Sequence, residues 1–175
     1  MRGQIILSHG SGSGPDATKV SALAALAESL GWRTQRPDYR DDDSRGLAGS
    51  VAPRIARLRA TIEELAAPPL LVGSSMGAFV SGLVSMDVPV AGLLLLATPV
   101  AIPGYARTFD LRSAVSTLLI HGWRDATCPL AGVQAFCAQR RLPLLVLDDD
   151  HRLGSSIDMI GAQLRHMLDL MAKAG

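Results

Sequence analysis

The sequence has few cysteines, few aromatic residues and almost no net charge, and each shortage excludes a class of protein. Two cysteines, Cys128 and Cys137, are too few for a disulfide scaffold and have no ligand partners at metal-site spacing. We therefore expect free thiols and a reducing compartment, the cytoplasm. A formal net charge of +1 gives no basic footprint for nucleic acid or an anionic membrane. The expected partners are small molecules.

Long hydrophobic runs are also missing. The most apolar region, residues 88–102, is broken by Pro89 and Pro99 and is too short to span a bilayer. The apolar stretch near the amino terminus, residues 5–7, is too short for a signal peptide. We expect no membrane segment. With 48% hydrophobic and 19% charged residues, residues 1–175 are expected to form one domain with a substantial core.

What the sequence does have is a series of short apolar runs that alternate with longer segments of helical period. The runs cover residues 4–8, 33–36, 70–73, 92–97, 117–122 and 143–148. Runs that are apolar at successive positions, as at 93–96, are typical of strands covered on both faces. The pattern predicts an α/β fold, a three-layer α/β/α doubly wound sandwich with about six mainly parallel strands.

The segments between the runs are predicted helices. Asp16 is expected to cap the first, which ends at Leu30 before Gly31. Ser50 is expected to cap the second, which ends before Pro68. Three further helices are expected to begin near Met76, Ala131 and Ser156.

Two stretches show no regular pattern and are expected to be loops. One covers residues 37–49 and includes Asp41, Asp42 and Asp43, and the other covers residues 98–114. Three consecutive carboxylates cannot all face one cation. We therefore interpret the aspartate run as a solvated part of its loop.

The sequence Gly-Ser-Ser-Met-Gly at residues 73–77 lies between an apolar run and a helical segment. This is the pattern of a sharp strand-to-helix turn with a serine at its apex, which makes Ser75 the candidate nucleophile. The turn also leaves the backbone N–H of Met76 in the first helical turn, where it can bind an oxyanion. The alternative interpretation is that the two glycines only permit close packing of helix against sheet.

Functional groups collect at the carboxyl ends of the strands in a parallel sheet. Asp125 follows the fifth apolar run, and His151 follows the sixth. A histidine beside a serine can remove the hydroxyl proton and so activate a poor nucleophile. Two partners for the imidazole are open: Asp125, which we favour, and the adjacent run of Asp148, Asp149 and Asp150.

Taken together, these motifs resemble the α/β-hydrolase superfamily over nearly the whole chain. Residues 73–77 are similar to the nucleophile elbow of that family, and the His-Gly-x-x-Asp run at 121–125 is similar to its acid loop. His151, before the last helix, is similar to its histidine. The resemblance implies that Ser75 attacks, His151 takes its proton and Asp125 holds the imidazole.

The first apolar run opens into a glycine-rich segment, residues 9–15, that could suggest a phosphate loop. The segment has no Gly-Lys-Ser/Thr, and Pro15 stands where the dinucleotide fingerprint needs a glycine. The resemblance gives the segment another role, since a His-Gly turn at this place supplies the second oxyanion donor in the family. It implies the N–H of Ser11, with that of Gly12 as the fallback.

His9 and His121 each precede a glycine at a strand end and are interpreted as structural residues. No carboxylate or cysteine recurs near them at ligand spacing. The superfamily that the chain resembles works without metal, so we expect neither metal nor cofactor. His166, in the last helix, is expected at the surface or at the edge of the core.

The chain lacks the extra strands and the helical lid of larger α/β-hydrolases, since only about twenty residues separate its fourth and fifth apolar runs. It resembles the small lid-less serine hydrolases of the dienelactone-hydrolase-like and related bacterial groups. Dienelactone hydrolases use cysteine where this chain has Ser75, which argues against that activity. An open site with few aromatic residues would contact substrate through Trp123, Phe79 and Tyr105.

The expected function is that of a serine hydrolase acting on a small soluble carboxylic ester or thioester through an acyl-enzyme. Three alternatives stay open: an amidase or peptidase, an acyl transferase, and a binding module that keeps the fold without catalysis. Nothing in the sequence commits the edge strands to pairing between subunits, so no oligomeric state is predicted.

Overall fold

A parallel sheet forms the centre of the structure, a computed structural model that describes residues 2–174. The strands are β1 (Gln4–Ser8), β2 (Arg33–Gln35), β3 (Leu70–Ser74), β4 (Gly92–Leu96), β5 (Thr117–Gly122) and β6 (Leu144–Leu147). Their order across the sheet is β2-β1-β3-β4-β5-β6, and every neighbouring pair is parallel. The predicted strands are confirmed, each bound within one residue.

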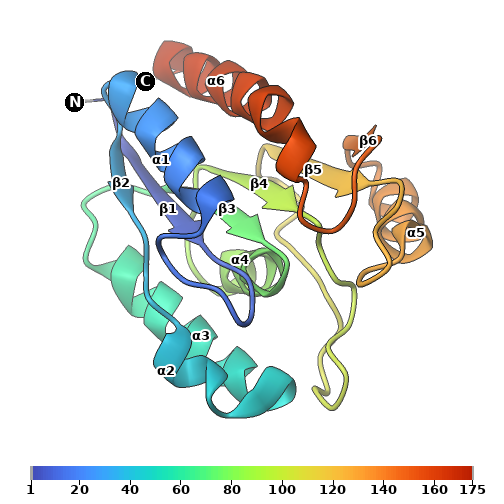
Figure 1. Cartoon of the computed structure of the whole chain (residues 1–175). Coiled ribbons are helices and arrows are strands. Elements are labelled where there is room, and N and C mark those ends of the chain that lie inside the picture. The colour runs from blue at the N-terminus through green and yellow to red at the C-terminus, as the bar shows by residue number, and fades with distance from the viewer. Residues whose placement is uncertain (1, 175) are drawn as a thin grey trace.

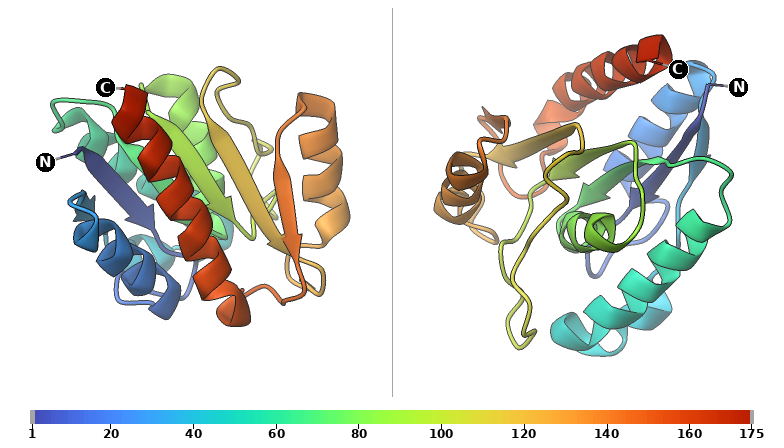
Figure 2. Two further views of the ribbon diagram at one scale, coloured as in Figure 1. Left: turned by 90° about the horizontal axis from the view of Figure 1, so that it is seen from above. Right: turned by 180° about the vertical axis from the view of Figure 1, so that it is seen from behind.

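Helices cover both faces of this sheet (Figure 1). One face carries α1 (Thr18–Ser29) and α6 (Ile157–Ala174), which a 3₁₀ turn, Gly154–Ser156, precedes. The other carries α3 (Gly46–Glu63), α4 (Met76–Asp87) and α5 (Leu130–Arg140), with the short α2 (Arg40–Asp43) beside α3. Figure 2 shows α6 lying across one side and α3 and α4 on the other. The predicted three-layer sandwich is therefore confirmed.

None of the described helices is long and apolar enough to cross a membrane.

The strand sequences explain the two cores. Alternate residues of a strand point to opposite faces, so Ile5 and Leu7 enter the core under α1 and α6, while Ile6 enters the core under α3 and α4. Every residue of β4 is buried. Burying such a side chain fully stabilises the fold by about 1.5–3 kcal/mol, which makes the central strands a rigid base for the loops at their ends.

Glycines bring α4 unusually close to the sheet. A Cβ on Gly77 would lie 2.1 Å from the carbonyl oxygen of Ser8, and one on Gly73 would lie 2.5 Å from that of Gly77. Both distances are impossible for a real side chain. The close packing that the sequence allowed as an alternative is therefore present, and it sets the segment between β3 and α4 against the end of β1.

Both predicted helix caps are wrong. Helix α1 begins at Thr18 with Ala17 in the capping position, and no side chain caps it. Helix α3 begins at Gly46, a full turn before Ser50. Ser50 is buried inside the helix, where its hydroxyl donates to the carbonyl of Leu47. A serine that bonds back to the preceding turn satisfies itself within a helix and does not mark its start.

The expected loop at residues 37–49 is also wrong, because it contains α2 and the first turn of α3. Of the three aspartates, Asp41 is exposed, whereas Asp42 and Asp43 are largely buried and form ion pairs with Arg57 and Arg54. The two ion pairs join this segment to α3. The second expected loop, residues 98–114, is confirmed as a stretch without helix or strand.

The connections place a topological switch point between β1 and β3. From β1 the chain passes through α1 to the edge strand β2, whereas from β3 it passes through α4 to β4, on the opposite side. Ligands of open parallel sheets bind outside the carboxyl ends of the strands at such a switch point. The segments that leave β1 and β3 there are the glycine-rich residues 9–15 and the turn at 73–77.

Candidate active site

Ser75 joins β3 to α4 in a strained backbone conformation. Its φ of 54° and ψ of −118° lie outside the regions that a residue with a side chain adopts readily. The turn is held from both sides: the N–H of Ser75 donates to the carbonyl of Leu96 at 2.8 Å, and its carbonyl accepts from Ala78 and Phe79. The strain presents the side chain at the apex of the turn, as the motif predicts.

His151 lies between Ser75 and Asp125, although the three are far apart in the sequence. Its Nε2 is 3.0 Å from Oγ of Ser75, and its Nδ1 is 2.8 Å from Oδ2 of Asp125. An ionised carboxylate only accepts hydrogen bonds, so Nδ1–H donates to Asp125. The opposite nitrogen is then left to accept the hydroxyl proton of Ser75.

Asp125 has a side chain with no exposure to solvent, and its two oxygens have separate partners. Oδ1 accepts the backbone N–H groups of Thr127 and Cys128, at 3.0 and 2.7 Å, which shapes the loop after β5. Oδ2 faces His151. The local turn and the contact with the imidazole are therefore compatible, since one carboxylate makes both.

The other aspartates that the sequence left open as partners of His151 bind elsewhere. Asp148 is exposed and pairs with Arg124. Asp149 accepts from the backbone of Ser155 and the hydroxyl of Ser156 at the start of α6. The carboxylate of Asp150 accepts the N–H two residues along the chain. The geometry thus favours Asp125 over the run at 148–150.

His121, on β5, supports the loop that carries Asp125. It is fully buried, and its Nε2 lies 2.7 Å from the carbonyl of Cys128 and 3.2 Å from Oδ2 of Asp125. Nε2–H donates to these oxygens, and Nδ1 has no hydrogen-bond partner among the described residues. This arrangement fits the structural role that the sequence predicted for His121.

On the other side of Ser75, the loop after β1 is held by a buried guanidinium. Arg54, whose side chain has no solvent exposure, donates to the carbonyls of His9 at 2.7 Å and Gly10 at 3.1 Å. Two further bonds, both of 2.7 Å, join it to the carboxylate of Asp43, and it lies over the ring of Tyr39. Each of the three guanidinium nitrogens has at least one partner, as a charge away from water requires.

The imidazole of His9 completes this support. Its Nε2 accepts the backbone N–H of Tyr39 at 3.0 Å, and burial lowers its pKa, which keeps the ring neutral and able to accept. The hydroxyls of Tyr39 and Ser8 are 2.9 Å apart, and burial raises the pKa of Tyr39 to about 12. His9 therefore acts structurally here, as the sequence predicted.

The candidate oxyanion donors lie on the two segments beside Ser75. Met76 is the first residue of α4, where a backbone N–H has no acceptor in its own helix. The loop after β1 runs against the serine, since a Cβ on Gly10 would lie 3.4 Å from that of Ser75. The N–H of Gly12, the fallback donor, is already directed at Asp43 at 3.3 Å, which leaves Ser11 as the better candidate of the two.

The predicted aromatic contacts differ in their exposure. Trp123 is 62% exposed on the loop after β5, and Tyr105 is half-buried. Phe79 is fully buried and packs against Tyr105 and Phe109, so it has no surface to offer a substrate. The reason is that every face of α4 near Phe79 is covered by the core.

A small cleft of about 140 Å³ lies beside the site, and its lining was not predicted. We name it the side cleft; its residues are Thr98, Pro99, Val100, Ala101, Thr127, Cys128, Pro129 and Val133. They come from the loops that follow β4 and β5 and from α5. No sequence motif predicts them. Small apolar residues in loops can be recognised as the lining of a cleft only from their contacts in the folded protein.

Lys19 is another neighbour that the sequence did not indicate. Its ammonium donates to the carbonyl of Arg152, next to His151, at 2.6 Å. Burial lowers its pKa to about 8, and the nearby Asp149, Asp125 and Asp150 oppose that shift. A helix on one side of the sheet thus contacts the histidine loop directly.

One group of side chains could hold a metal ion in principle. Single ligand atoms of Asp125, Cys128 and His151 all lie within 4.8 Å of one another. Burial raises the pKa of the Cys128 thiol to about 11, so in the metal-free protein this group is a thiol and not a thiolate. The imidazole and carboxylate are at hydrogen-bonding distance from each other, an arrangement suited to a proton relay.

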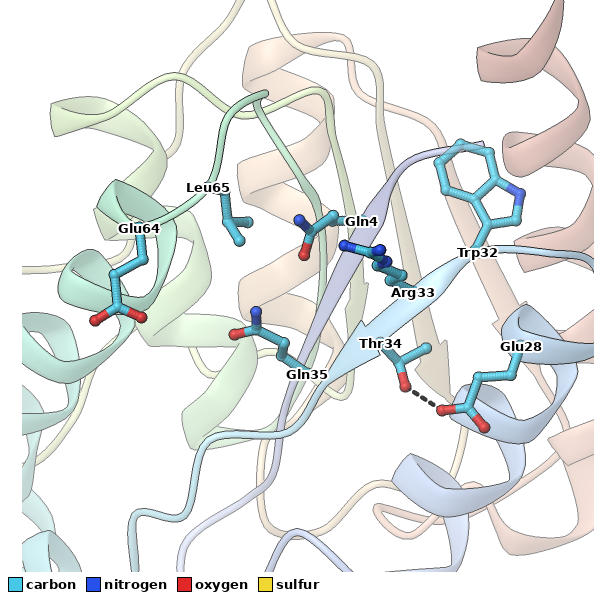
Figure 3. Close-up of a pocket in the computed structure, with 8 residues that line it drawn as sticks. All are labelled: Gln4, Glu28, Trp32, Arg33, Thr34, Gln35, Glu64 and Leu65. Atoms are coloured by element: carbon cyan, nitrogen blue, oxygen red, sulfur yellow. Dashed lines mark hydrogen bonds between the residues drawn. The ribbon is translucent and has the colours of Figure 1, made fainter. Parts of the chain in front are cut away.

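A larger hollow, of about 540 Å³, lies at the β2 edge of the sheet (Figure 3). Its lining residues are Gln4, Glu28, Trp32, Arg33, Thr34, Gln35, Glu64 and Leu65. Its lining includes all three residues of the edge strand β2, so this hollow lies along that edge of the sheet, away from Ser75. The hydroxyl of Thr34 donates to Glu28 there. A catalytic site is expected at the carboxyl ends, where Ser75 lies.

The fold is that of the α/β-hydrolases, and comparison with known proteins agrees. A family model described as an alpha/beta hydrolase domain matches residues 1–174, and the chain belongs to this family. No curated protein sequence matches it. Family membership and the solved relatives support hydrolase activity.

Three solved structures illustrate the likeness. A candidate hydrolase of the α/β superfamily from Xanthomonas campestris pv. campestris is 39% identical, with a TM-score of 0.88 over 96% of this chain and 99% of that one. A serine hydrolase homologue from Coxiella burnetii is 25% identical, with a TM-score of 0.74 over 96% and 86%. A lid-less serine hydrolase from Xanthomonas campestris, 19% identical, shares the fold, with a TM-score of 0.76 over 94% and 80%.

Proposed function

We propose that this chain is a serine hydrolase that cleaves small carboxylic esters or thioesters through an acyl-enzyme. The observation that carries the proposal is the continuous hydrogen-bonded path from Ser75 Oγ through His151 to Asp125, with steps of 3.0 and 2.8 Å. A serine, a base and a buried carboxylate in this order can transfer a proton as the serine attacks. Both cysteines are free, which supports work in a reducing compartment such as the cytoplasm.

In the first half of the reaction, Ser75 Oγ attacks the carbonyl carbon while His151 Nε2 takes its proton. Asp125 stays ionised and stabilises the imidazolium that forms. The oxyanion is bound by the N–H groups of Met76 and Ser11, each worth a factor of about 10²–10³ in turnover. His151 then gives the proton to the leaving oxygen or sulfur, which departs as the C–O or C–S bond breaks.

In the second half, a water molecule takes the place of the leaving group. His151 removes a proton from the water as its oxygen attacks the acyl-enzyme, and then returns a proton to Ser75. The strained turn at Ser75 and the bond to Leu96 keep the serine oxygen in the same position for both steps. Net hydrolysis leaves the enzyme unchanged.

The proposal is tested by a fluorophosphonate probe together with hydrolysis of p-nitrophenyl acetate. We expect the wild type to be labelled and active, and Ser75→Ala to lose labelling and about 10⁵–10⁶-fold in turnover. The matched control is Ser74→Ala, one residue earlier, which should stay within about threefold because its hydroxyl has no part in the relay. A folded wild type that neither reacts with the probe nor turns over any ester would support a binding module instead.

A further inference from the structure

The side cleft opens next to the reacting groups. The N–H of Ser75 bonds to Leu96, the last residue of β4, and the loop that forms one wall of the cleft begins directly afterwards. The other wall contains Cys128, whose sulfur lies within 4.8 Å of ligand atoms of His151 and Asp125. The cleft therefore adjoins the loop that holds Asp125 and the segment that follows the strand bonded to Ser75.

The directions available at the reacting carbon assign the cleft to one part of the substrate. The oxyanion must point to Met76 and to the loop after β1, on one side of β3. The leaving group must lie at His151 Nε2, which protonates it. The remaining substituent is the acyl chain, and it must point away from β1, toward the ends of β4 and β5, where the side cleft lies.

The chemistry of the cleft selects the kind of chain. Val133, at 1% exposure, and the half-buried Val100 are apolar wall residues, and no charged side chain lines the cleft. Its volume of about 140 Å³ is that of about five water molecules at roughly 30 Å³ each, and a methylene group is of similar size. The space fits a short uncharged chain.

We propose that the side cleft is the acyl-binding site and that it limits the substrate to an uncharged acyl group of up to about five carbons. This inference rests on the proposed serine hydrolase function. Each further methylene that such a pocket accepts changes kcat/KM by a factor of about 10–200, so the limit is measurable. Val100, Ala101 and Val133 are then the residues that determine chain length.

The test uses two ester series on the full chain: p-nitrophenyl esters from acetate to decanoate, and alkyl acetates with alcohols of the same lengths. For the wild type we expect kcat/KM to rise with acyl length up to butyrate or valerate and then to fall at least tenfold by decanoate. In the alkyl acetate series, lengthening the alcohol from one ester to the next should change kcat/KM less than threefold. A preference set by the alcohol would overturn the acyl assignment.

A filling variant sharpens the test. Ala101 is exposed at the rim, so Ala101→Phe adds bulk to the cleft without entering the core. It should reduce the ratio of kcat/KM for butyrate to kcat/KM for acetate at least tenfold. Ala106→Phe is the matched control, since Ala106 is exposed in the same loop but does not line the cleft. Val100→Ala, which enlarges the cleft, should move the optimum to a longer chain.

The outcomes separate the two proposals. If no ester gives turnover that Ser75→Ala abolishes, the proposed function fails, and the acyl assignment fails with it. If turnover depends on Ser75 but Ala101→Phe and Val100→Ala both keep the wild-type chain-length profile, the acyl assignment alone is wrong. Opposite shifts in the two variants support it.

Discussion

Ser75 lies between two groups of loops that are held in place in different ways. On the side of β5 and β6, the reacting groups help to hold their own loops, since Asp125 bonds the backbone of its own turn and also His151. His121 and Lys19 add further bonds there. On the side of β1, the loop is held by Arg54 and Asp43, which lie on other elements. We call the first side self-contained because a reacting group supports its own loop, whereas the second depends on distant residues alone.

The difference follows from what each side contributes to the proposed reaction. The β5 and β6 loops contribute side chains, which can hydrogen-bond in several directions at once. The β1 loop contributes backbone N–H groups, whose direction is fixed only when the neighbouring carbonyls are fixed. Arg54 binds two of these carbonyls, and Asp43 binds the N–H of Gly12. A buried ion pair thus orients a backbone that has no side-chain chemistry of its own.

The largest expected effect belongs to the self-contained side. Asp125→Asn should reduce turnover by about 10⁴-fold, because an amide in this position no longer favours the tautomer with Nδ1–H directed at it. The unfolding free energy should change far less than turnover does, since the amide oxygen can still accept from Thr127 and Cys128. Steady-state kinetics with p-nitrophenyl acetate and urea unfolding measure the two quantities.

Asp148→Asn is the matched control, because Asp148 belongs to the run next to His151 but is exposed and paired with Arg124. It should leave turnover within about twofold, since an exposed ion pair contributes little. A twofold effect of Asp125→Asn combined with a large effect in the run at 148–150 would move the orienting role to that run.

The two sides also differ in how well the sequence predicts them. Ser75, Asp125 and His151 are visible because each follows an apolar strand, and the carboxyl ends of parallel strands meet at one edge. Arg54 and Asp43 are not visible, because a partner for a charged residue is chosen by the packing of α2 against α3 and not by a spacing rule. A run of three aspartates is indeed typical of a solvated loop, and burial of Asp42 and Asp43 overrides that pattern.

The contrast between strand patterns and packing contacts also explains which predictions of helices and strands are confirmed and which are wrong. All six strands are predicted within one residue, because runs buried on both faces leave a signal in every residue. The caps at Asp16 and Ser50 are wrong, because capping depends on local backbone angles that tertiary contacts decide. Phe79 shows the limit for pockets: an aromatic residue on the helix after the serine looks like a substrate contact, and only its full burial reveals a core residue.

Arg54 provides the next test of the comparison. Arg54→Met should lower the unfolding free energy by about 3–5 kcal/mol, because it leaves the largely buried Asp43 without its cation and two carbonyls without donors. In the folded fraction we expect turnover to fall by a further 10–100-fold as the β1 loop loses its position. Urea unfolding and kinetics at low temperature measure these effects separately.

Arg57→Met is the control for Arg54, one turn along α3. Arg57 also pairs with an aspartate, Asp42, but it is 45% exposed and donates to that carboxylate, not to the carbonyls of the β1 loop, so turnover should stay unchanged in the folded protein even though Asp42 loses its cation. Should Arg54→Met fail to fold, Arg54→Lys keeps the charge but loses the planar fork, and it should lose turnover more than stability. Equal effects on turnover at positions 54 and 57 would contradict the proposed support of the β1 loop.

The smallest expected effect concerns Lys19, which connects α1 with the histidine loop through the carbonyl of Arg152. Burial lowers the pKa of Lys19 from 10.5 to about 8, so between these values the unfolded chain binds more protons than the folded one. Stability from this group therefore rises with pH across that window, and the cost of burying the ammonium is fully present below it. The difference in unfolding free energy between wild type and Lys19→Met should shift in favour of the wild type by roughly 1–3 kcal/mol from pH 8 to pH 10.5.

Lys173, the other lysine of the chain, is exposed near the end of α6 and supplies the control for Lys19. The Lys173→Met variant shows what the loss of an exposed ammonium does to the unfolding free energy. Urea unfolding of the three proteins at pH 7, 8, 9, 10 and 10.5 makes the comparison. A flat difference for Lys19→Met would show that its ammonium remains hydrated, and that the link from α1 to the histidine loop is a surface contact and not a buried one.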